Sequence, residues 1–390
     1  MRRKRRKRAE PPVIACWGFY GERNVGDDYI LYELLRFLQE RQPAAEIWIF
    51  SNSRDVLRLV PAGMEAAVLP RSVRASFSAC RKADLVVCGP GGLFPHRNTG
   101  KLLFWNLLLA VSKLWGHRMA FIGLGVGSEN FRTGLGRFLL RNLIVHADGF
   151  AARQQGVKAG VRLPQKREDR LVEAGDVLFG TKPPERRPAQ AGTVAVALAD
   201  IFGDAATERK AFLKGLSGVL NELTGRGYAL LLLTFTDRKD DRFSREALEY
   251  LDNPDAVRLS PFPEHPADIL KELGSAEVCI CMRFHALVLA SCLRVPSVAI
   301  AYSDKLDDAA ERLGLSDYLV RVCIGGGQYY RRRIAFDADR FREAVYRALA
   351  EKAAIRQTLD ENVPRLAREA DRNWAVLDRV LTKMKGSAKP

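Results

Sequence analysis

The sequence lacks the patterns that mark disulfide-rich, metal-binding or membrane-spanning proteins. Its seven cysteines are odd in number and scattered, and no two of them have the spacing of zinc ligands. Its longest apolar stretch, Leu102 to Trp115, is interrupted by Asn106 and Lys113 and is too short to cross a bilayer. These absences argue against a disulfide scaffold and a zinc module, and they favour a reducing compartment. We expect residues 102–115 to form a buried helix.

We expect no secretory signal peptide near the start of the sequence. Pro11 and Pro12 interrupt the segment after the basic residues, and the apolar run from Val13 to Trp17 leads directly into Gly18 and a loop. We therefore expect a cytoplasmic protein.

Acidic residues are fewer than basic ones, 46 against 62, which gives a formal net charge of +16. Residues 2–8 are all arginine or lysine and contribute +7, so that +9 of the +16 belongs to the rest of the chain. A block of like charges is expected to be disordered. Residues 2–8 could bring the protein to the anionic inner face of a membrane, could attract nucleic acid, or could be a solvated tail without a specific role.

The length of 390 residues predicts two domains of ordinary size. Strand and helix patterns alternate in both halves, which is typical of mostly parallel sheets covered by helices on both faces. A polar, proline-rich segment separates the halves, and two α/β domains joined in this way would face each other across a cleft. We divide the chain into a basic tail (1–10), an N-terminal α/β domain (11–180), a linker (181–192), a C-terminal α/β domain (193–335) and a C-terminal helical segment (336–390) that is broken near Pro364.

Apolar runs and helical periodicity locate the main elements within this division. The predicted strands cover 13–19, 47–51, 84–88 and 119–124 in the first half, and 194–199, 228–234, 278–281 and a run from Ser297 in the second. The predicted helices include 27–39, 102–115, 208–224, 244–251 and 266–273.

One strand-to-helix junction stands out, because the apolar run 278–281 is followed by Arg283 and His285 and then by an apolar, helical stretch. Open α/β sheets bind ligands where a strand's carboxyl end meets a helix amino terminus, and that terminus offers N–H groups to an anion. Arg283 and His285 are therefore predicted to hold a phosphate or carboxylate and to move a proton.

Glycine-rich loops follow three other predicted strands. Asn24, Asp27 and Asp28 belong to the first loop, where the two carboxylates could bind a ligand or only cap the helix that follows. The second loop holds Gly89, Gly91 and Gly92, which could form a backbone nest for an anion.

The third loop, Gly123-Leu124-Gly125-Val126-Gly127, lacks the spacing of a dinucleotide fingerprint, and no acidic residue follows at the right distance. We reject NAD binding on that ground. Arg153 follows a further apolar segment, and its guanidinium could bind a carboxylate or phosphate or simply be exposed.

Taken together, these motifs resemble those of the polysaccharide pyruvyl transferase family. That family has Gly-x-x-Asn-x-Gly-Asp-Glu, a glycine triplet, Gly-x-Gly-x-Gly, an Arg-Asp pair, Arg-Leu-His-Ala, Val-Pro-x-Val and Tyr-x-x-Lys, in this order. Here Asp28 replaces the Glu, Pro90 interrupts the triplet and Gln154 replaces the Asp. The matching residues are Asn24, Gly26, Asp27, Asp28, Gly89, Gly91, Gly92, Gly123, Gly125, Gly127, Arg153, Arg283, Phe284, His285, Ala286, Val295, Pro296, Tyr302 and Lys305.

The resemblance implies a GT-B-like pair of Rossmann-like α/β domains and a specific reaction. The family transfers the pyruvyl group of phosphoenolpyruvate to two hydroxyls of one sugar, as a cyclic ketal, and releases phosphate. The acceptor sugar would belong to a polysaccharide of the cell envelope or to its lipid-linked precursor.

The residues suit this chemistry. Arg153 and Arg283 could hold the charged donor, and His285 could act as the acid/base or as the partner of the leaving phosphate. Asp27 or Asp28 would be a second base or an acceptor ligand. No metal or other cofactor is expected, because cationic side chains could offset the donor's charge. The remaining substrate-binding candidates are Asn24, Gly91, Gly92, Gly125, Tyr302 and Lys305.

Two alternatives use other features of the sequence. A nucleotide-sugar glycosyltransferase of the same architecture often has a Glu-x7-Glu pair, and Glu264 and Glu272 have that spacing, but one helix too early. The predicted helix from Ala286 to Leu293 holds no carboxylate. A nucleic-acid binder would depend on residues 2–8, since the rest of the chain lacks alternating aromatic and basic residues.

Overall fold

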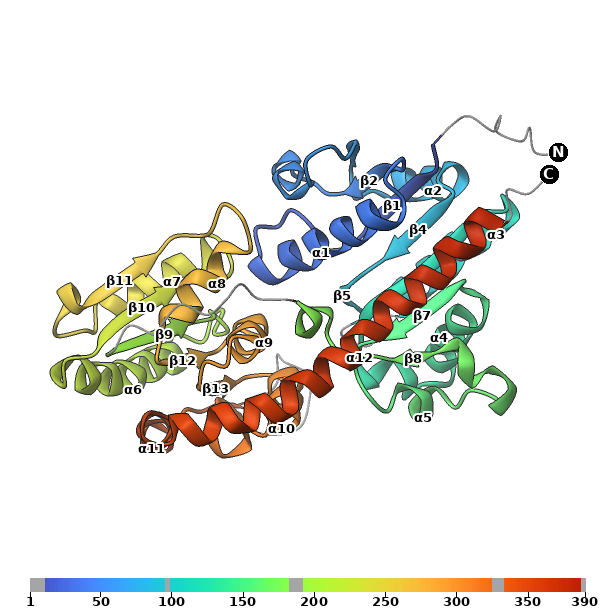
Figure 1. Ribbon diagram of the computed structural model, residues 1–390. Coiled ribbons are helices and arrows are strands. Elements are labelled where there is room, and N and C mark those ends of the chain that lie inside the picture. The colour runs from blue at the N-terminus through green and yellow to red at the C-terminus, as the bar shows by residue number, and fades with distance from the viewer. Residues whose placement is uncertain (1–10, 95–98, 182–191, 325–332, 387–390) are drawn as a thin grey trace. The chain divides into compact units, whose positions relative to one another are not determined.

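The structure is a computed structural model that describes residues 11–94, 99–181, 192–324 and 333–386 (Figure 1). The chain divides into two compact units. The first unit comprises Met1–Glu22, Asp27–Gly180 and Leu366–Pro390, and the second comprises Arg23–Gly26 and Thr181–Arg365. The C-terminal helical segment is thus divided between the two units. The basic tail and residues 182–191 of the expected linker lie outside the described residues.

Parallel strands form the sheet of the first unit, with eight strands in its described part. The order is β3-β2-β1-β4-β6-β7-β8, and β5 pairs with β6. The strands are β1 (Val13–Trp17), β2 (Glu46–Phe50), β3 (Ala66–Leu69), β4 (Leu85–Cys88), β5 (Gly91–Phe94), β6 (Arg118–Val126), β7 (Gly149–Ala152) and β8 (Val172–Glu173). The central strands are continuous apolar runs because both faces of a parallel sheet are covered.

Two groups of helices cover the faces of this sheet, and each group packs on its own apolar core. On one face lie α2 (Val73–Lys82), α3 (Thr99–Leu114) and α4 (Gly134–His146). On the other face lie α1 (Val25–Arg41) and the last turns of α12 (Lys352–Gly386). A short helix, α5 (Val157–Val161), follows β7.

The second unit has a parallel sheet of six strands among its described residues, in the order β11-β10-β9-β12-β13-β14. Its strands are β9 (Thr193–Ala197), β10 (Ala229–Leu233), β11 (Val257–Ser260), β12 (Val278–Cys281), β13 (Ser297–Ala301) and β14 (Leu319–Arg321), and β15 (Cys323–Ile324) pairs with β16 (Arg333–Ile334) apart from this sheet. The helices are α6 (Ala206–Gly225), α7 (Lys239–Leu248), α8 (Asp268–Ser275), α9 (Phe284–Cys292), α10 (Asp304–Leu313), α11 (Ala338–Ala350) and the first turns of α12.

Each sheet reverses its strand order at one place, between β1 and β4 in the first unit and between β9 and β12 in the second. In doubly wound folds the crevice at the carboxyl ends of the strands at such a switch point is the preferred ligand site. The glycine loop after β4 and the Arg283–His285 junction after β12 both follow strands at a switch point. The predicted class of two Rossmann-like domains is confirmed.

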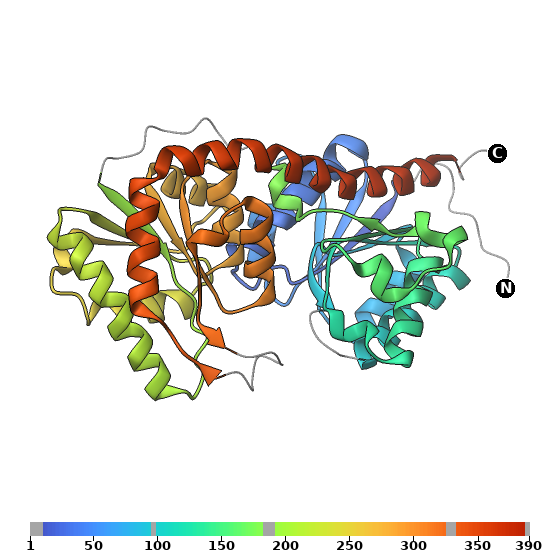
Figure 2. The same ribbon diagram turned by 90° about the horizontal axis from the view of Figure 1, so that it is seen from below.

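Several predicted boundaries were wrong. Helix α1 begins at Val25, so Asp27 and Asp28 lie within its first turn and neither is its N-cap. Helix α7 begins at Lys239, five residues before the predicted start. The C-terminal helices are separated at Glu351, and Pro364 lies inside α12 without ending it. Figure 2 draws α12 as one continuous red helix.

Helix α3 is not the buried helix that its apolar sequence predicts. Leu102, Trp105 and Leu109 are buried in the core, whereas Leu103 and Leu114 on its outer side are 50% and 83% exposed. No helix among the described residues is both long and apolar enough to cross a membrane.

We expect Phe121→Ala to destabilise the first unit strongly. Phe121 is fully buried on β6, 5.3 Å from the ring of Phe150 and 5.8 Å from that of Trp105, so the truncation would leave a cavity. Such a change costs about 3–5 kcal/mol. Phe138→Ala on the outer side of α4 is the matched control, and it should leave the unfolding curve unchanged. Chemical denaturation followed by circular dichroism measures both, and equal effects would contradict this description of the core.

Candidate active site

Arg283 is held by a buried carboxylate at the beginning of helix α9. It is the N-cap residue of α9, directly after β12. Its Nε donates to Asp240 Oδ2 at 3.0 Å, and an Nη atom donates to Asp240 Oδ1. The Asp240 side chain is completely buried, whereas 20% of the Arg283 side chain is exposed. The contact is therefore a two-point ion pair that fixes the plane of the guanidinium.

Asp240 is itself anchored to the backbone. The N–H group of Thr236 donates to Asp240 Oδ2 at 2.7 Å, across the loop between β10 and α7. Burial raises the pKa of Asp240 above its ordinary value, although the Arg283 guanidinium opposes this shift. An uncompensated charge would be costly here, so the carboxylate and the guanidinium depend on each other.

Tyr302 and Lys305 lie beyond the next strand of the same sheet. Tyr302 follows β13, and burial raises the pKa of its hydroxyl. Desolvation lowers the pKa of Arg283, but the charge of Asp240 and the interactions with Tyr302 outweigh it, so the pKa is raised. Lys305 is half-buried in the first turn of α10. Arg283 thus follows β12, and Tyr302 and Lys305 follow β13, the neighbouring parallel strand.

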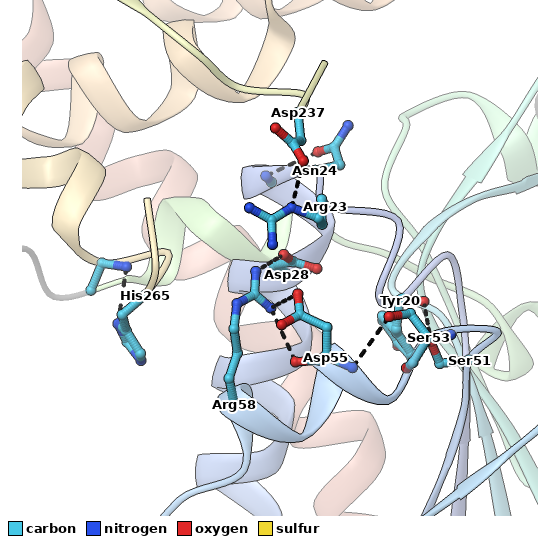
Figure 3. Close-up of polar contacts among 12 residues, drawn as sticks. Tyr20, Arg23, Asn24, Asp28, Ser51, Ser53, Asp55, Arg58, Asp237 and His265 are labelled. Carbon is cyan, nitrogen blue, oxygen red and sulfur yellow. Dashed lines mark hydrogen bonds and ion pairs between the residues drawn. The ribbon is translucent and has the colours of Figure 1, made fainter. Parts of the chain in front are cut away.

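The segment Arg23–Gly26 belongs to this cluster although it precedes α1. Asn24 forms an antiparallel bridge with Thr236, and its Nδ2 donates to Thr236 Oγ1 at 3.3 Å. Arg23 forms an ion pair with Asp237 at 2.6 Å (Figure 3). Asn24 Oδ1 accepts a hydrogen bond from the N–H group of Gly26, which closes a tight turn.

This turn presses the backbone of Gly26 against the catalytic candidate His285. A Cβ atom at Gly26 would lie 1.6 Å from His285 Nδ1. His285 is half-buried in the first turn of α9, with its ring edge-on to Phe284 at 5.0 Å. Glycine at position 26 therefore leaves the space that the imidazole occupies.

In the first unit, Arg153 and three of the predicted glycines come together. Arg153 Nη1 donates to Asp176 Oδ2 at 2.9 Å, and both side chains are buried. A Cβ atom at Gly125 would lie 3.0 Å from Arg153 Nη2 and 3.4 Å from the Cα of Gly92. A Cβ atom at Gly91 would lie 3.6 Å from Asp27 Oδ1. Asp27, Gly91, Gly92, Gly125 and Arg153 thus line one region of this unit.

Asp28 has different surroundings from Asp27. It is 1% exposed, and Arg58 Nη2 donates to its Oδ2 at 2.5 Å (Figure 3). Arg58 also forms an ion pair with Asp55 at 3.5 Å. Burial raises the pKa of Asp28, and the Arg58 guanidinium opposes this shift. These contacts give Asp28 a structural role in holding α1 to residues 55–58.

Sequence reasoning missed the two carboxylates that hold the arginines. Asp240 stands within the charged run Asp237-Arg-Lys-Asp-Asp, which resembles an exposed helix face. Asp176 follows β8 and is far along the sequence from the glycine-rich loops that drew attention. Gln154, at the position of the family's aspartate, accepts a hydrogen bond from the N–H group of Val126 at 2.8 Å, and Asp176 supplies the carboxylate to Arg153.

The described residues contain no group of three His, Cys, Asp or Glu side chains that could hold a metal ion. The candidate residues provide guanidinium groups in fixed orientation, an imidazole at a helix amino terminus, and a carboxylate next to a glycine loop. Such groups can bind a small anion and transfer protons.

Several solved structures share this fold. A putative UDP-N-acetylglucosamine 2-epimerase from Listeria monocytogenes matches with a TM-score of 0.64 at 10% identity, over 96% of this chain and 98% of that chain. UDP-GlcNAc 2-epimerase from Neisseria meningitidis bound to UDP-GlcNAc matches with 0.59 at 11% identity, over 95% and 100%. UGT2 from Phytolacca americana complexed with UDP-2fluoro-glucose and pterostilbene matches with 0.57 at 13% identity, over 96% and 100%. At these identities the likeness defines the fold alone, the GT-B class.

The sequence itself defines the family. A search of curated protein sequences finds no match. The profile of the family described as Polysaccharide pyruvyl transferase matches residues 24–304. The chain therefore belongs to the polysaccharide pyruvyl transferase family, and the resemblance seen in its motifs is confirmed.

We expect Asp240→Asn to destabilise the second unit, because it leaves the partly buried Arg283 charge without its partner. Loss of one member of such a pair costs about 3 kcal/mol or more. Asp241→Asn is the matched control, since Asp241 pairs with the 64% exposed Arg245 and should leave stability unchanged. Denaturant unfolding followed by circular dichroism measures both variants. If Asp240→Asn unfolds like the wild type, the ion pair does not hold this site.

Proposed function

We propose that the protein transfers the pyruvyl group of phosphoenolpyruvate to two hydroxyls of one sugar, forms a cyclic ketal and releases phosphate. The sugar would belong to a polysaccharide or to its lipid-linked precursor. Family membership supports a transferase that acts on polysaccharide. One observation carries the more specific proposal. Arg283, which Asp240 holds in place, is the N-cap of α9, and His285 follows in the first turn of the same helix.

The donor carries a carboxylate and a phosphate, so its binding needs several fixed cationic donors. Asp240 uses two N–H groups of Arg283, and a guanidinium has five. Tyr302 takes part in a further hydrogen bond with Arg283. The remaining N–H groups can bind a ligand, together with the N–H groups at the beginning of α9. We assign donor binding to Arg283, Arg153, Tyr302 and Lys305. We assign further contacts with the substrates to Asn24 and to three glycines of the loops, Gly91, Gly92 and Gly125.

The reaction needs two proton transfers that balance. Attack of the first sugar hydroxyl on C2 of the donor breaks the C2–C3 double bond, and C3 gains a proton as the hydroxyl loses one. Attack of the second hydroxyl on C2 breaks the bond to the phosphate oxygen, and the released phosphate takes up the second proton. An imidazole can give or accept such a proton, so we assign His285 as acid/base or as partner of the leaving phosphate.

Asp27 is the more suitable carboxylate for the acceptor. It is half-buried and lies next to Gly91, whereas Asp28 is occupied by Arg58. We assign Asp27 as second base or as ligand of an acceptor hydroxyl, and we withdraw that role from Asp28.

A nucleotide-sugar glycosyltransferase is the competing function, because the structural neighbours include such enzymes. Glu272 on α8 is the second glutamate of the Glu-x7-Glu spacing, and it forms an ion pair with Arg258 of β11. Helix α9 holds no carboxylate. We therefore do not propose this function, and the assay described next distinguishes it from pyruvyl transfer.

We expect the wild-type protein to release phosphate from phosphoenolpyruvate in the presence of a suitable glycoside, and His285→Ala and Arg283→Ala each to lower that rate at least tenfold. His265→Ala and Arg258→Ala are the matched controls in the same unit and should retain activity. Mass spectrometry of the glycoside should show the added ketal. Release of nucleoside diphosphate from a nucleotide sugar, with no reaction of phosphoenolpyruvate, would favour the glycosyltransferase.

We expect Gly26→Ala to lower the same activity at least tenfold, because the added methyl group would displace the His285 ring. Gly218→Ala on α6 has open space around it and serves as the control. The rates and the far-ultraviolet circular dichroism of both variants should be compared. Full activity in Gly26→Ala would show that the position of the imidazole does not matter for the reaction.

A further inference from the structure

The outer side of helices α2, α3 and α4 is apolar to an unusual degree. Their inner sides belong to a single core. Among the described residues, every large apolar side chain that is exposed lies on these helices or directly after α3. They are Val73, Leu103, Leu107, Leu114, Trp115, Leu135 and Phe138. We call this surface the α3–α4 face.

The spacing of these residues makes continuous stripes. On α3, Leu103, Leu107 and Leu114 are four and seven residues apart, which places them on one side of the helix. The stripe spans about 17 Å at the rise of an α-helix. On α4 the exposed apolar residues are Leu135 and Phe138. Asn106 of α3 donates to the Leu139 carbonyl of α4 at 3.1 Å, so the two helices are neighbours.

The charge around this face is predominantly positive. Residues 66–147 contain eleven arginine and lysine residues but two acidic residues, Asp84 and Glu129, although the whole chain has 46 acidic residues among 390. None of the three helices contains an acidic residue. Their exposed basic residues include Arg74, Arg81, Lys82, Lys101 and Lys113.

Aromatic side chains add to this pattern. The Arg81 guanidinium lies 4.6 Å from the Trp115 ring centroid, in a cation–π contact at the end of α3. Tryptophan is enriched where a protein meets the interface of a membrane, because its ring is apolar and its N–H group is polar. An apolar face of this size is also more than isolated exposed leucines would explain.

We propose that the α3–α4 face binds the surface of a membrane that contains anionic phospholipids. Leu103, Leu107, Leu114 and Phe138 would enter the boundary between headgroups and acyl chains, and the surrounding basic residues would contact lipid phosphates. A neutral or basic partner would not require that carboxylates be absent from three helices. The proposal concerns where the protein binds and does not depend on the proposed reaction.

Vesicle sedimentation of the full-length protein tests this proposal, with vesicles of phosphatidylcholine alone or of equal parts phosphatidylcholine and phosphatidylglycerol. The basic residues 2–8 could bind lipid by themselves, so a variant with all seven changed to glutamine is the reference. We expect this reference to bind the anionic vesicles at least tenfold more than the neutral ones. Leu103→Gln/Leu107→Gln/Phe138→Gln should lower that binding at least tenfold.

A second set of variants separates the face from net charge. Arg74→Gln/Arg81→Gln/Lys101→Gln should weaken binding to anionic vesicles at least fivefold. Arg245→Gln/Arg258→Gln/Arg321→Gln removes the same charge from exposed positions of the second unit and should change it less than twofold. Equal effects of the two sets, or binding that depends on residues 2–8 alone, would overturn the proposal. A dimer in sedimentation velocity that the apolar triple variant dissociates, without lipid binding, would assign the face to a second copy of the chain.

Discussion

The buried ion pair between Asp240 and Arg283 constrains the candidate site more than any other interaction. The carboxylate is completely inaccessible, and its free energy of burial is tolerable only because a guanidinium binds both oxygens and a backbone N–H group donates to it. Arg283 in turn is the N-cap of α9, so fixing its side chain also fixes how β12 leads into the helix. His285, Tyr302 and the turn at Asn24 all lie around this pair.

The first unit repeats this arrangement with other residues. Arg153 follows β7 and is bound by the buried Asp176, as Arg283 follows β12 and is bound by Asp240. In both units a glycine lies against the functional side chain, Gly125 against Arg153 and Gly26 against His285. Each guanidinium is therefore held rigidly before any ligand binds, which limits the entropy lost on binding a small anion.

Much of the fold could be predicted from the sequence, since continuous apolar runs and helical stripes are local signals. Strand β12 was predicted with its exact bounds, and the Arg283–His285 junction lies where the pattern indicated. The outward leucines of α3 were mistaken for core, because composition alone does not tell which side of a helix is covered. Asp240 and Asp176 could not be predicted, since each reaches its arginine through a contact made only by the folded chain. Sequence could not distinguish Asp28 from Asp27, because the contact of Asp28 with Arg58 is also made only by the folded chain.

Calorimetric titration with phosphoenolpyruvate measures the central claim most directly, because it needs no acceptor sugar. We predict one binding site per chain in the wild-type protein and a dissociation constant at least tenfold higher in Arg283→Ala. The variant Arg258→Ala, at an exposed position, should bind as the wild type does. Failure of the folded wild-type protein to bind phosphoenolpyruvate, or equal affinity in all three proteins, would contradict it.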